Sequence, residues 1–190
     1  MSMDRGKRPA PPGIAVADAT PAEVEAMIRV DHAGELGAVR IYEGQLAVLK
    51  ARRGARDSVA AVTKMLKQEK QHLKTFETLV NERRVRPTAL EPVWWVAGFA
   101  LGAATALMGE KSAMACTAAV EEVIGGHYAG QIARLDDDAL KATVEEFRAD
   151  EVAHRDEALA RGAEQAPAYR LLSETIKAGC RLAIALSERL

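Results

Sequence analysis

The sequence has little cysteine, few aromatic residues and almost no excess charge. Its two cysteines, Cys116 and Cys180, lie far apart along the chain, which excludes a Cys-x-x-Cys redox pair, a thiolate zinc site and a disulfide framework, and favours a reducing compartment. Aromatic residues make up only 4% while alanine is abundant, so helices are favoured over strands. A net charge of -1 lacks the basic excess of a general nucleic-acid binder, and we expect no nucleic acid as a partner.

The length of the chain suits one domain with a core of its own. Residues 1–20 hold three of the seven prolines and lack the apolar stretch of a secretory signal. We therefore expect a flexible N-terminal arm over 1–20 and a single helical domain over 21–190. Thr20, Pro21 and Glu23 supply an N-cap, a proline at the first helical position and an acid three residues after the cap, so the first helix should begin there.

Apolar residues recur at intervals of three and four along most of this domain, which is the pattern of amphipathic helices. We expect a first helix that ends near Arg52, long helices over 58–84, 110–135 and 138–161, and a last helix after Pro167. The last helix has no ionisable residue on its apolar stripe, which indicates a purely structural role. The domain is therefore predicted to be all-α.

Four of the predicted helices carry acids on the stripe that faces the core. In chain order they give a lone Glu, a Glu-x-x-His motif, a second lone Glu and a second Glu-x-x-His motif. A carboxylate buried there without a partner costs several kcal/mol, so a cation is expected to compensate it. A separation of three places the Glu and the His on adjacent turns of one face, where both reach a common ion. The inward-facing residues are Glu35, Glu69, His72, Glu121, Glu151 and His154.

One Glu-x-x-His motif by itself is common in charged helices and has an ordinary explanation. Two copies in register with the core, alternating with two lone acids, are hard to attribute to chance. Four carboxylates and two imidazoles suit two redox-capable metal ions, as in the carboxylate four-helix bundles, and iron is the preferred ion. We expect two iron ions in a ferritin-like four-helix bundle with two additional helices. Glu69 and Glu151 are the candidate bridging carboxylates, and the sequence leaves open which carboxylates bridge.

Longer motifs add a specific resemblance. They are RVDHAGELGA (29–38), QEKQHL (68–73), MACT (114–117), VEE (120–122), HY (127–128), DEVAH (150–154), AGCR (178–181) and SERL (187–190). With these motifs the chain resembles the demethoxyubiquinone hydroxylase family of ubiquinone biosynthesis, from about residue 23 to the C-terminus.

The resemblance implies a di-iron monooxygenase that uses O₂ to hydroxylate the ring of a prenylated demethoxyubiquinol. It assigns the metal-ligand roles to the same six residues and leaves the electron donor open, a reduced nicotinamide or another donor. It also suggests a lipid-binding accessory protein as a partner, while self-association into a homo-oligomer stays open. The short arm resembles that of bacterial members, which implies the cytoplasmic face of a bacterial inner membrane, or the matrix face in a mitochondrion. The alternative is a ferritin-like ferroxidase or iron-storage protein, which needs a soluble cage.

Four further residues near the ligands are candidates for the site. Tyr128 shares the face of Glu121, so we expect it, and His127 beside it, to line a pocket, guide a proton or orient the ring. A core tyrosine with a satisfied hydroxyl is the plain alternative. Asp31 and Asp150 are candidates to hold a ligand imidazole from behind. An acid in an N-terminal turn or in solvent is the alternative for both, and for Asp150 it is the favoured one.

Residues 92–109 form an uncharged run of 18 residues. As a helix it would be roughly 27 Å long, just short of the hydrocarbon core of a bilayer, and a span here would place the two ligand pairs on opposite sides of the membrane. We interpret the run as a helix in the plane of the membrane interface or lining a tunnel, through which a prenylated quinol enters from the lipid; a buried connector helix is the alternative. Gly98 and Gly102 predict a close helix approach. The predicted interface residues are Trp94, Trp95, Phe99 and Leu101.

Overall fold

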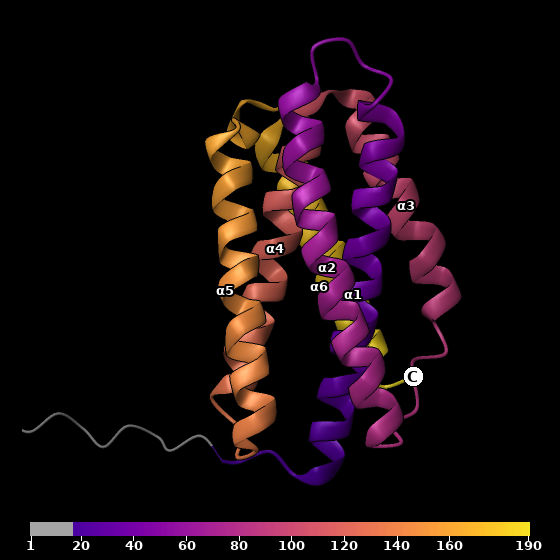
Figure 1. Ribbon diagram of the computed structural model, residues 1–190, viewed down its shortest axis with the longest axis vertical. Helices are drawn as coiled ribbons and strands as arrows, with labels where there is room; N and C mark the ends of the chain where they lie inside the picture. The colour runs from indigo at the N-terminus through magenta and orange to yellow at the C-terminus, as the bar shows by residue number, and fades with distance from the viewer. Residues whose placement is uncertain (1–16) are drawn as a thin grey trace, which may run out of the picture.

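The computed structural model describes residues 17–190, and its regular elements in that range are all helical (Figure 1). The all-α prediction is confirmed, and the helix ends agree with the expected ones to within a few residues. The N-terminal arm expected over residues 1–20 falls mostly outside the described range. The elements are α1 (Pro21–Leu49), α2 (Arg56–Glu82), α3 (Glu91–Met108), α4 (Glu110–Ile132), α5 (Asp138–Ala160), a short 3₁₀ turn η1 (Ala163–Gln165) and α6 (Tyr169–Ser187).

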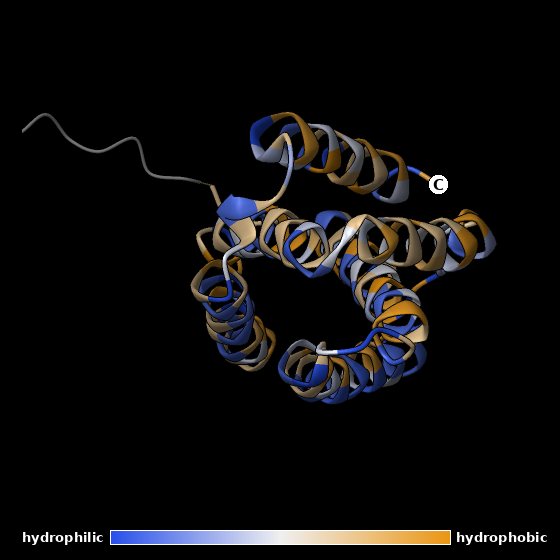
Figure 2. Ribbon diagram, turned by 90° about the horizontal axis from the view of Figure 1, so that it is seen from above, coloured by the Kyte–Doolittle hydropathy of each residue, from blue (hydrophilic) through white to orange (hydrophobic). Residues whose placement is uncertain are grey.

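Helices α1, α2, α4 and α5 form a four-helix bundle, and α3 and α6 lie outside it. Helix α3 packs along the outer side of α1, and α6 packs chiefly against α4 (Figures 1 and 2). The view along the bundle axis shows the four core helices as a ring with α6 outside it (Figure 2). The expected four-helix bundle with two additional helices is confirmed.

Local signals in the sequence set the first helix boundary as expected. The Thr20 hydroxyl accepts a hydrogen bond from the Glu23 backbone N–H at 3.4 Å, and the Thr20 N–H donates to the Glu23 carboxylate at 2.8 Å. Between α3 and α4 the chain turns at Gly109 alone, with φ of 131°, in a region of backbone space that favours glycine. The apolar α3 is thereby joined directly to a core helix.

Small residues allow α3 to lie almost in backbone contact with α1. A Cβ atom on Gly98 would lie 2.9 Å from the Gly37 carbonyl oxygen, and one on Gly102 would collide with the backbone of Ile41. From the other side, Gly44 meets the backbone of α3 in the same way. The close approach predicted from the glycine spacing is confirmed, and it fixes α3 against the bundle.

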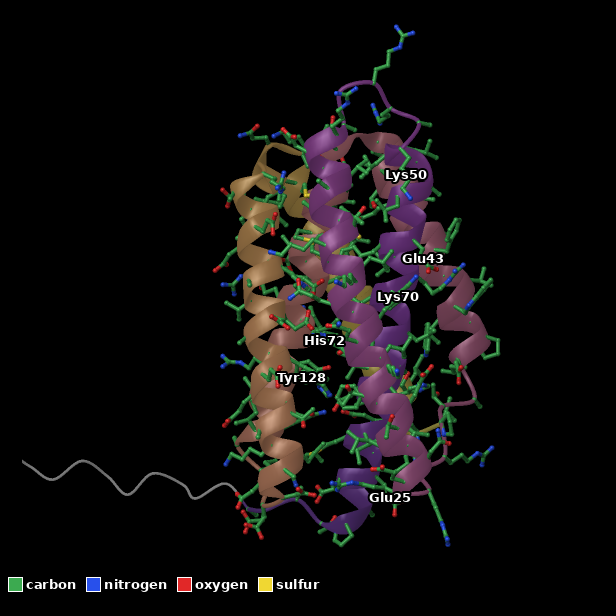
Figure 3. The ribbon with its side chains drawn as sticks, viewed as in Figure 1. Glu25, Glu43, Lys50, Lys70, His72 and Tyr128 are labelled. Atoms are coloured by element: carbon green, nitrogen blue, oxygen red, sulfur yellow. The ribbon has the colours of Figure 1, made fainter. Side chains whose placement is uncertain are left out.

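The interior holds a polar belt between two apolar regions. On one side lie Leu46, Leu49 and Met65, and on the other lie Ile28 and Phe76, with other buried side chains. His72 lies inside the bundle between these regions, and Tyr128 lies inside it as part of the second region (Figure 3). The ion pair between Lys70 and Glu43, at 2.9 Å, lies on the outer side of α1 and α2 (Figure 3). Within residues 17–190, no helix is long and apolar enough to cross a bilayer.

Candidate metal centre

The polar belt is built from the six inward-facing residues predicted by the sequence. Helix α1 contributes one acid, α4 contributes another, and α2 and α5 each contribute a Glu-x-x-His motif. All six side chains are at most 3% exposed, and they come together in the middle of the bundle. They are Glu35 of α1, Glu69 and His72 of α2, Glu121 of α4, and Glu151 and His154 of α5.

These residues form two overlapping groups of donor atoms, in each of which the donors lie within 4.8 Å of one another. One group is Glu35, Glu69, His72 and Glu151, and the other is Glu69, Glu121, Glu151 and His154. The overlap comes from Glu69 and Glu151, which belong to both groups. Two neighbouring ions sharing two carboxylates would fit this arrangement.

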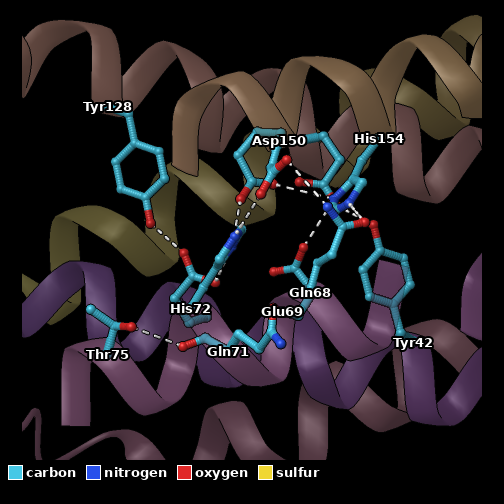
Figure 4. A network of polar contacts seen from close by, with 12 residues as sticks. Tyr42, Gln68, Glu69, Gln71, His72, Thr75, Tyr128, Asp150 and His154 are labelled. Carbon is cyan, nitrogen blue, oxygen red and sulfur yellow. Dashed lines mark hydrogen bonds and ion pairs between the residues drawn. The ribbon is translucent and has the colours of Figure 1, made fainter. Parts of the chain in front are cut away.

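Each histidine faces the acid of the opposite motif. The Nδ1 atom of His72 lies 3.4 Å from a Glu151 oxygen, and the Nδ1 atom of His154 lies 3.0 Å from a Glu69 oxygen (Figure 4). His72 Nδ1 also lies 3.6 Å from a Glu35 oxygen. Both imidazoles therefore point Nδ1 into the centre, and the two motifs interlock across α2 and α5.

Most donor atoms of these residues lack a hydrogen-bond partner. Among the described residues, the buried side-chain atoms without a hydrogen-bond partner include both oxygens of Glu69 and of Glu151, and Nδ1 of His72 and of His154. One oxygen of Glu35 and one of Glu121 also lack a hydrogen-bond partner. Unpaired buried polar atoms are costly, and here they converge on one point. This donor set fits metal ions, and four carboxylates match the charge of two divalent cations.

Without metal, this many acids cannot all be ionised in the interior. Burial raises the pKa of Glu69 and of Glu121 well above the ordinary value, and neighbouring carboxylates add to the effect. Burial likewise raises the pKa of Glu151 to about 8. For His154, burial lowers the pKa; for His72, burial acts in the same direction, but the contacts with Glu35 and with Asp150 raise its pKa overall.

Two tyrosines hold the lone acids in a crossed arrangement. Tyr128 follows Glu121 by seven positions and donates its hydroxyl hydrogen bond to Glu35. Tyr42 follows Glu35 by seven positions and donates to Glu121. The sequence predicted a site position for Tyr128 and missed Tyr42, although the same spacing after a lone Glu in both halves was a usable signal. Since each hydroxyl is buried and satisfied, the tyrosines fix the carboxylate orientations.

A second pair of residues lies behind the histidines. His72 Nε2 lies 3.1 Å from an Asp150 oxygen, so Asp150 contacts a candidate ligand imidazole, in the position proposed for it. His154 Nε2 lies 3.2 Å from Oε1 of Gln68, a residue that sequence reasoning did not single out (Figure 4). Gln68 occupies the position before Glu69 that Asp150 occupies before Glu151, and this correspondence was the missed signal.

Asp31 and His127 lie in a separate polar cluster. Asp31 accepts a hydrogen bond from the Gln131 side chain at 2.7 Å and lies 3.6 Å from Nε2 of His127. The histidine that Asp31 approaches is thus His127, which is outside both donor groups, rather than a candidate ligand. His127 is half-buried and in turn contacts Gln131 at 2.9 Å.

An apolar pocket of about 370 Å³ lies between α1, α3, α4 and α6. Two of the predicted interface residues, Trp94 and Leu101, are half-buried in its wall, where Trp94 donates from Nε1 to the Ser187 hydroxyl at 2.9 Å. The α6 residues Ile176 and Cys180 form another part of the wall. The last helix therefore lines a pocket in addition to the structural role predicted for it.

The other predicted interface residues lie nearer the surface. Trp95 is 50% exposed and Phe99 is half-buried, and the guanidinium of Arg40 lies over both rings, 3.7 Å and 4.9 Å from their centroids. The large apolar side chains that α3 exposes are Val93, Trp95, Val96, Leu107 and Met108. Contact of this surface with a membrane stays a prediction.

The bundle and its shared donor groups have the arrangement of the carboxylate four-helix bundles, a class whose members hold two metal ions between facing helices. Comparison of sequences then places the chain within that class. It belongs to the family described as Ubiquinone biosynthesis protein COQ7, which matches residues 22–187. The family expected from the sequence motifs is thereby confirmed.

Relatives in both bacteria and eukaryotes resemble the chain over most of its length. It is 59% identical over 175 residues to the 3-demethoxyubiquinol 3-hydroxylase of Rhodospirillum rubrum, covering 90% of this chain and 81% of that one. It is 51% identical over 185 residues to the mitochondrial NADPH-dependent 3-demethoxyubiquinone 3-hydroxylase of Homo sapiens, with 94% and 83% covered. The mitochondrial 5-demethoxyubiquinone hydroxylase of Saccharomyces cerevisiae is 41% identical over 192 residues, with 92% and 82% covered.

Proposed function

We propose that the chain is a 3-demethoxyubiquinol 3-hydroxylase, an O₂-dependent monooxygenase that adds a hydroxyl group to the ring of a prenylated quinol. The observation that carries this proposal is the convergence, in a chain of this family, of six buried residues that each have at least one donor atom without a hydrogen-bond partner. The names of the relatives supply the substrate class, since those proteins are called demethoxyubiquinol or demethoxyubiquinone hydroxylases.

The proposed cofactor is a pair of iron ions. Bound iron supplies the one-electron reactions with O₂ that no side chain provides. The first ion would be held by Glu35, Glu69, His72 and Glu151, and the second by Glu69, Glu121, Glu151 and His154, the two groups described above.

The protein's own residues position and shield the reacting groups. Tyr42 and Tyr128 hold Glu121 and Glu35 through their hydroxyl hydrogen bonds, so that these carboxylates need little reorganisation. The apolar regions on both sides of the polar belt exclude water from it. Overall, O₂, two electrons and two protons convert the quinol to its hydroxylated product and one water. NADPH, which appears in the names of several relatives, is the electron donor that we propose to test.

The apolar pocket is the proposed site for the prenyl tail. Its lining residues Gly34 and Val120 directly precede Glu35 and Glu121, so a tail held there lies alongside the metal centre. A pocket of this size and apolar lining is typical of sites for hydrophobic ligands. The pocket is bordered by α3, whose exposed apolar side chains we propose to rest on the membrane surface from which the substrate comes.

Isotope-labelled turnover tests the hydroxylase function. Metal-free protein is loaded anaerobically with two equivalents of Fe²⁺ and then given ¹⁸O₂, NADPH and a short-tail demethoxyubiquinol. We expect one ¹⁸O atom in the product, measured by mass spectrometry. Oxidation of Fe²⁺ without any labelled quinol, under these conditions, would favour the ferroxidase alternative and overturn the hydroxylase proposal.

A matched pair of variants tests the ligand assignment. Glu121 is 2% exposed and points into the centre, whereas its neighbour Glu122 is exposed on the same helix. Glu121→Ala is expected to bind less than two equivalents of iron and to lose hydroxylation, and Glu122→Ala is expected to retain both. Full turnover by Glu121→Ala would refute the assignment.

Flotation with liposomes tests the membrane surface. The triple change Val93→Ser, Trp95→Ser and Val96→Ser removes three exposed apolar side chains of α3. We expect less protein to float with the liposomes and turnover of a long-tail quinol to fall more than turnover of a short-tail one. If wild-type protein does not associate with liposomes, the membrane proposal fails while the hydroxylase proposal stands.

A further inference from the structure

The two halves of the metal centre repeat each other in their ligand positions, but the residues that contact the outer side of the two histidines differ. Gln68 precedes Glu69 in the first Glu-x-x-His motif, and Asp150 precedes Glu151 in the second. Each of the two preceding residues reaches across to the histidine of the other motif (Figure 4). One imidazole is thus held by an amide and the other by a carboxylate.

The hydrogen bonds fix the direction of this network. His72 and His154 point Nδ1 into the centre, and their Nε2 atoms face oxygens of Asp150 and Gln68 that accept hydrogen bonds, so Nε2 carries the proton that each donates outward. His72 donates to Asp150 at 3.1 Å, and His154 donates to Oε1 of Gln68 at 3.2 Å. The Gln68 amide nitrogen in turn donates to the other Asp150 oxygen at 3.2 Å. Reversing the Gln68 amide would set donor against donor and acceptor against acceptor, so only this orientation satisfies all three bonds.

The chemical difference between the two acceptors affects the metal positions. A carboxylate attracts the imidazole proton more strongly than an amide oxygen does, and it makes the opposite nitrogen a better metal ligand. We propose that Gln68 and Asp150 are positioning residues that make the two metal positions unequal, with the His72 position binding more tightly than the His154 position. This inference rests on the metal centre of the proposed function and is independent of the substrate.

The order of metal filling tests this inference directly. Zn²⁺ is a suitable diamagnetic probe, and long-range ¹H–¹⁵N NMR spectra of the imidazoles report which Nδ1 atom is bound. In the wild-type protein we expect the first equivalent to shift His72 and the second to shift His154. Gln68→Met removes the acceptor behind His154 and is expected to weaken that position alone, by about tenfold.

An exchanged pair gives the sharpest version of the test. In the double variant Gln68→Glu, Asp150→Asn, the asparagine amide can donate to the new carboxylate, and each histidine keeps an acceptor. The network stays complete while the carboxylate moves behind His154, so the filling order should reverse. The control Gln71→Glu, Glu146→Gln moves one negative charge between the same two helices at exposed positions and should fill as the wild type does.

The outcomes separate this inference from the proposed function. An unchanged filling order in the exchanged variant, or equal filling of both positions in the wild type, would overturn the inference. If Gln68 has a purely structural role, Gln68→Met should weaken metal binding at both positions together. That result would also contradict the inference. In metal-free protein, Gln68→Met should remove the protected Nε2–H resonance of His154 and spare that of His72. That readout tests the hydrogen bond on which the inference depends, and neither it nor the filling order with Zn²⁺ requires hydroxylation.

Discussion

The buried acids predict that metal-free protein loses stability as the pH rises. The pKa of Glu151 is raised from 4.5 to about 8 by burial. Between these values the folded protein keeps a proton that the unfolded chain has released, so the free energy of unfolding falls with increasing pH. From about pH 6.5 to 8, Glu151 alone accounts for a loss of about 1.5 kcal/mol. The raised pKa values of Glu69 and Glu121 act in the same direction.

The predicted loss of stability starts near pH 6.5 because His154 has the opposite effect on the free energy of unfolding below that pH. The pKa of this histidine is lowered from 6.5, so its protonation favours the unfolded chain at lower pH. Above pH 6.5 the acids dominate, and a loss of about 1.5 kcal/mol corresponds to a fall in Tm of roughly 3–6 °C for a chain of this size.

Chemical and thermal denaturation of protein treated with chelator measure this effect. Glu151→Gln should reduce the slope of the free energy of unfolding against pH by the equivalent of one proton. Glu146→Gln, the same change at an exposed position of α5, should leave that slope unchanged. Saturating divalent metal should reverse the trend, because the ligands bind as anions. Stability that is constant or increases from about pH 6.5 to 8 in metal-free protein would refute the reasoning.

Two further predictions concern the close contact of α3 with α1 and the hydrogen bond of Tyr42. Gly102→Ala places a methyl group against the backbone of Ile41 and should cost about 1–3 kcal/mol in denaturation experiments, whereas Gly126→Ala, with nothing within 4 Å, should be neutral or stabilising by about 0.5–1 kcal/mol. Equal effects of the two changes would contradict the close contact of α3 with α1. Tyr42→Phe removes the hydrogen bond to Glu121 and should lower the free energy of unfolding of metal-free protein by about 1–3 kcal/mol; an unchanged value would contradict that role.

The sequence alone determined the helices and the faces that they bury. Because a helix repeats every 3.6 residues, the apolar stripes showed that Glu35, Glu69, Glu121 and Glu151 face inward before any contact was known. The cost of burying charge then required a compensating cation. The longer motifs, most of which contain or adjoin these residues, indicated the family.

Only the tertiary structure decided which side chains meet. Periodicity shows which side chains of a helix face the core, but it does not show how far neighbouring helices are shifted along the bundle axis. That shift depends on how the helices pack. The crossed contacts of Tyr42 with Glu121 and of Gln68 with His154 join residues 79 and 86 positions apart, and neither partner can be read from local spacing. The apolar pocket likewise depends on tertiary packing, because it forms where α3 and α6 pack against the outer sides of α1 and α4. The glycines of α3 allow its close contact with α1.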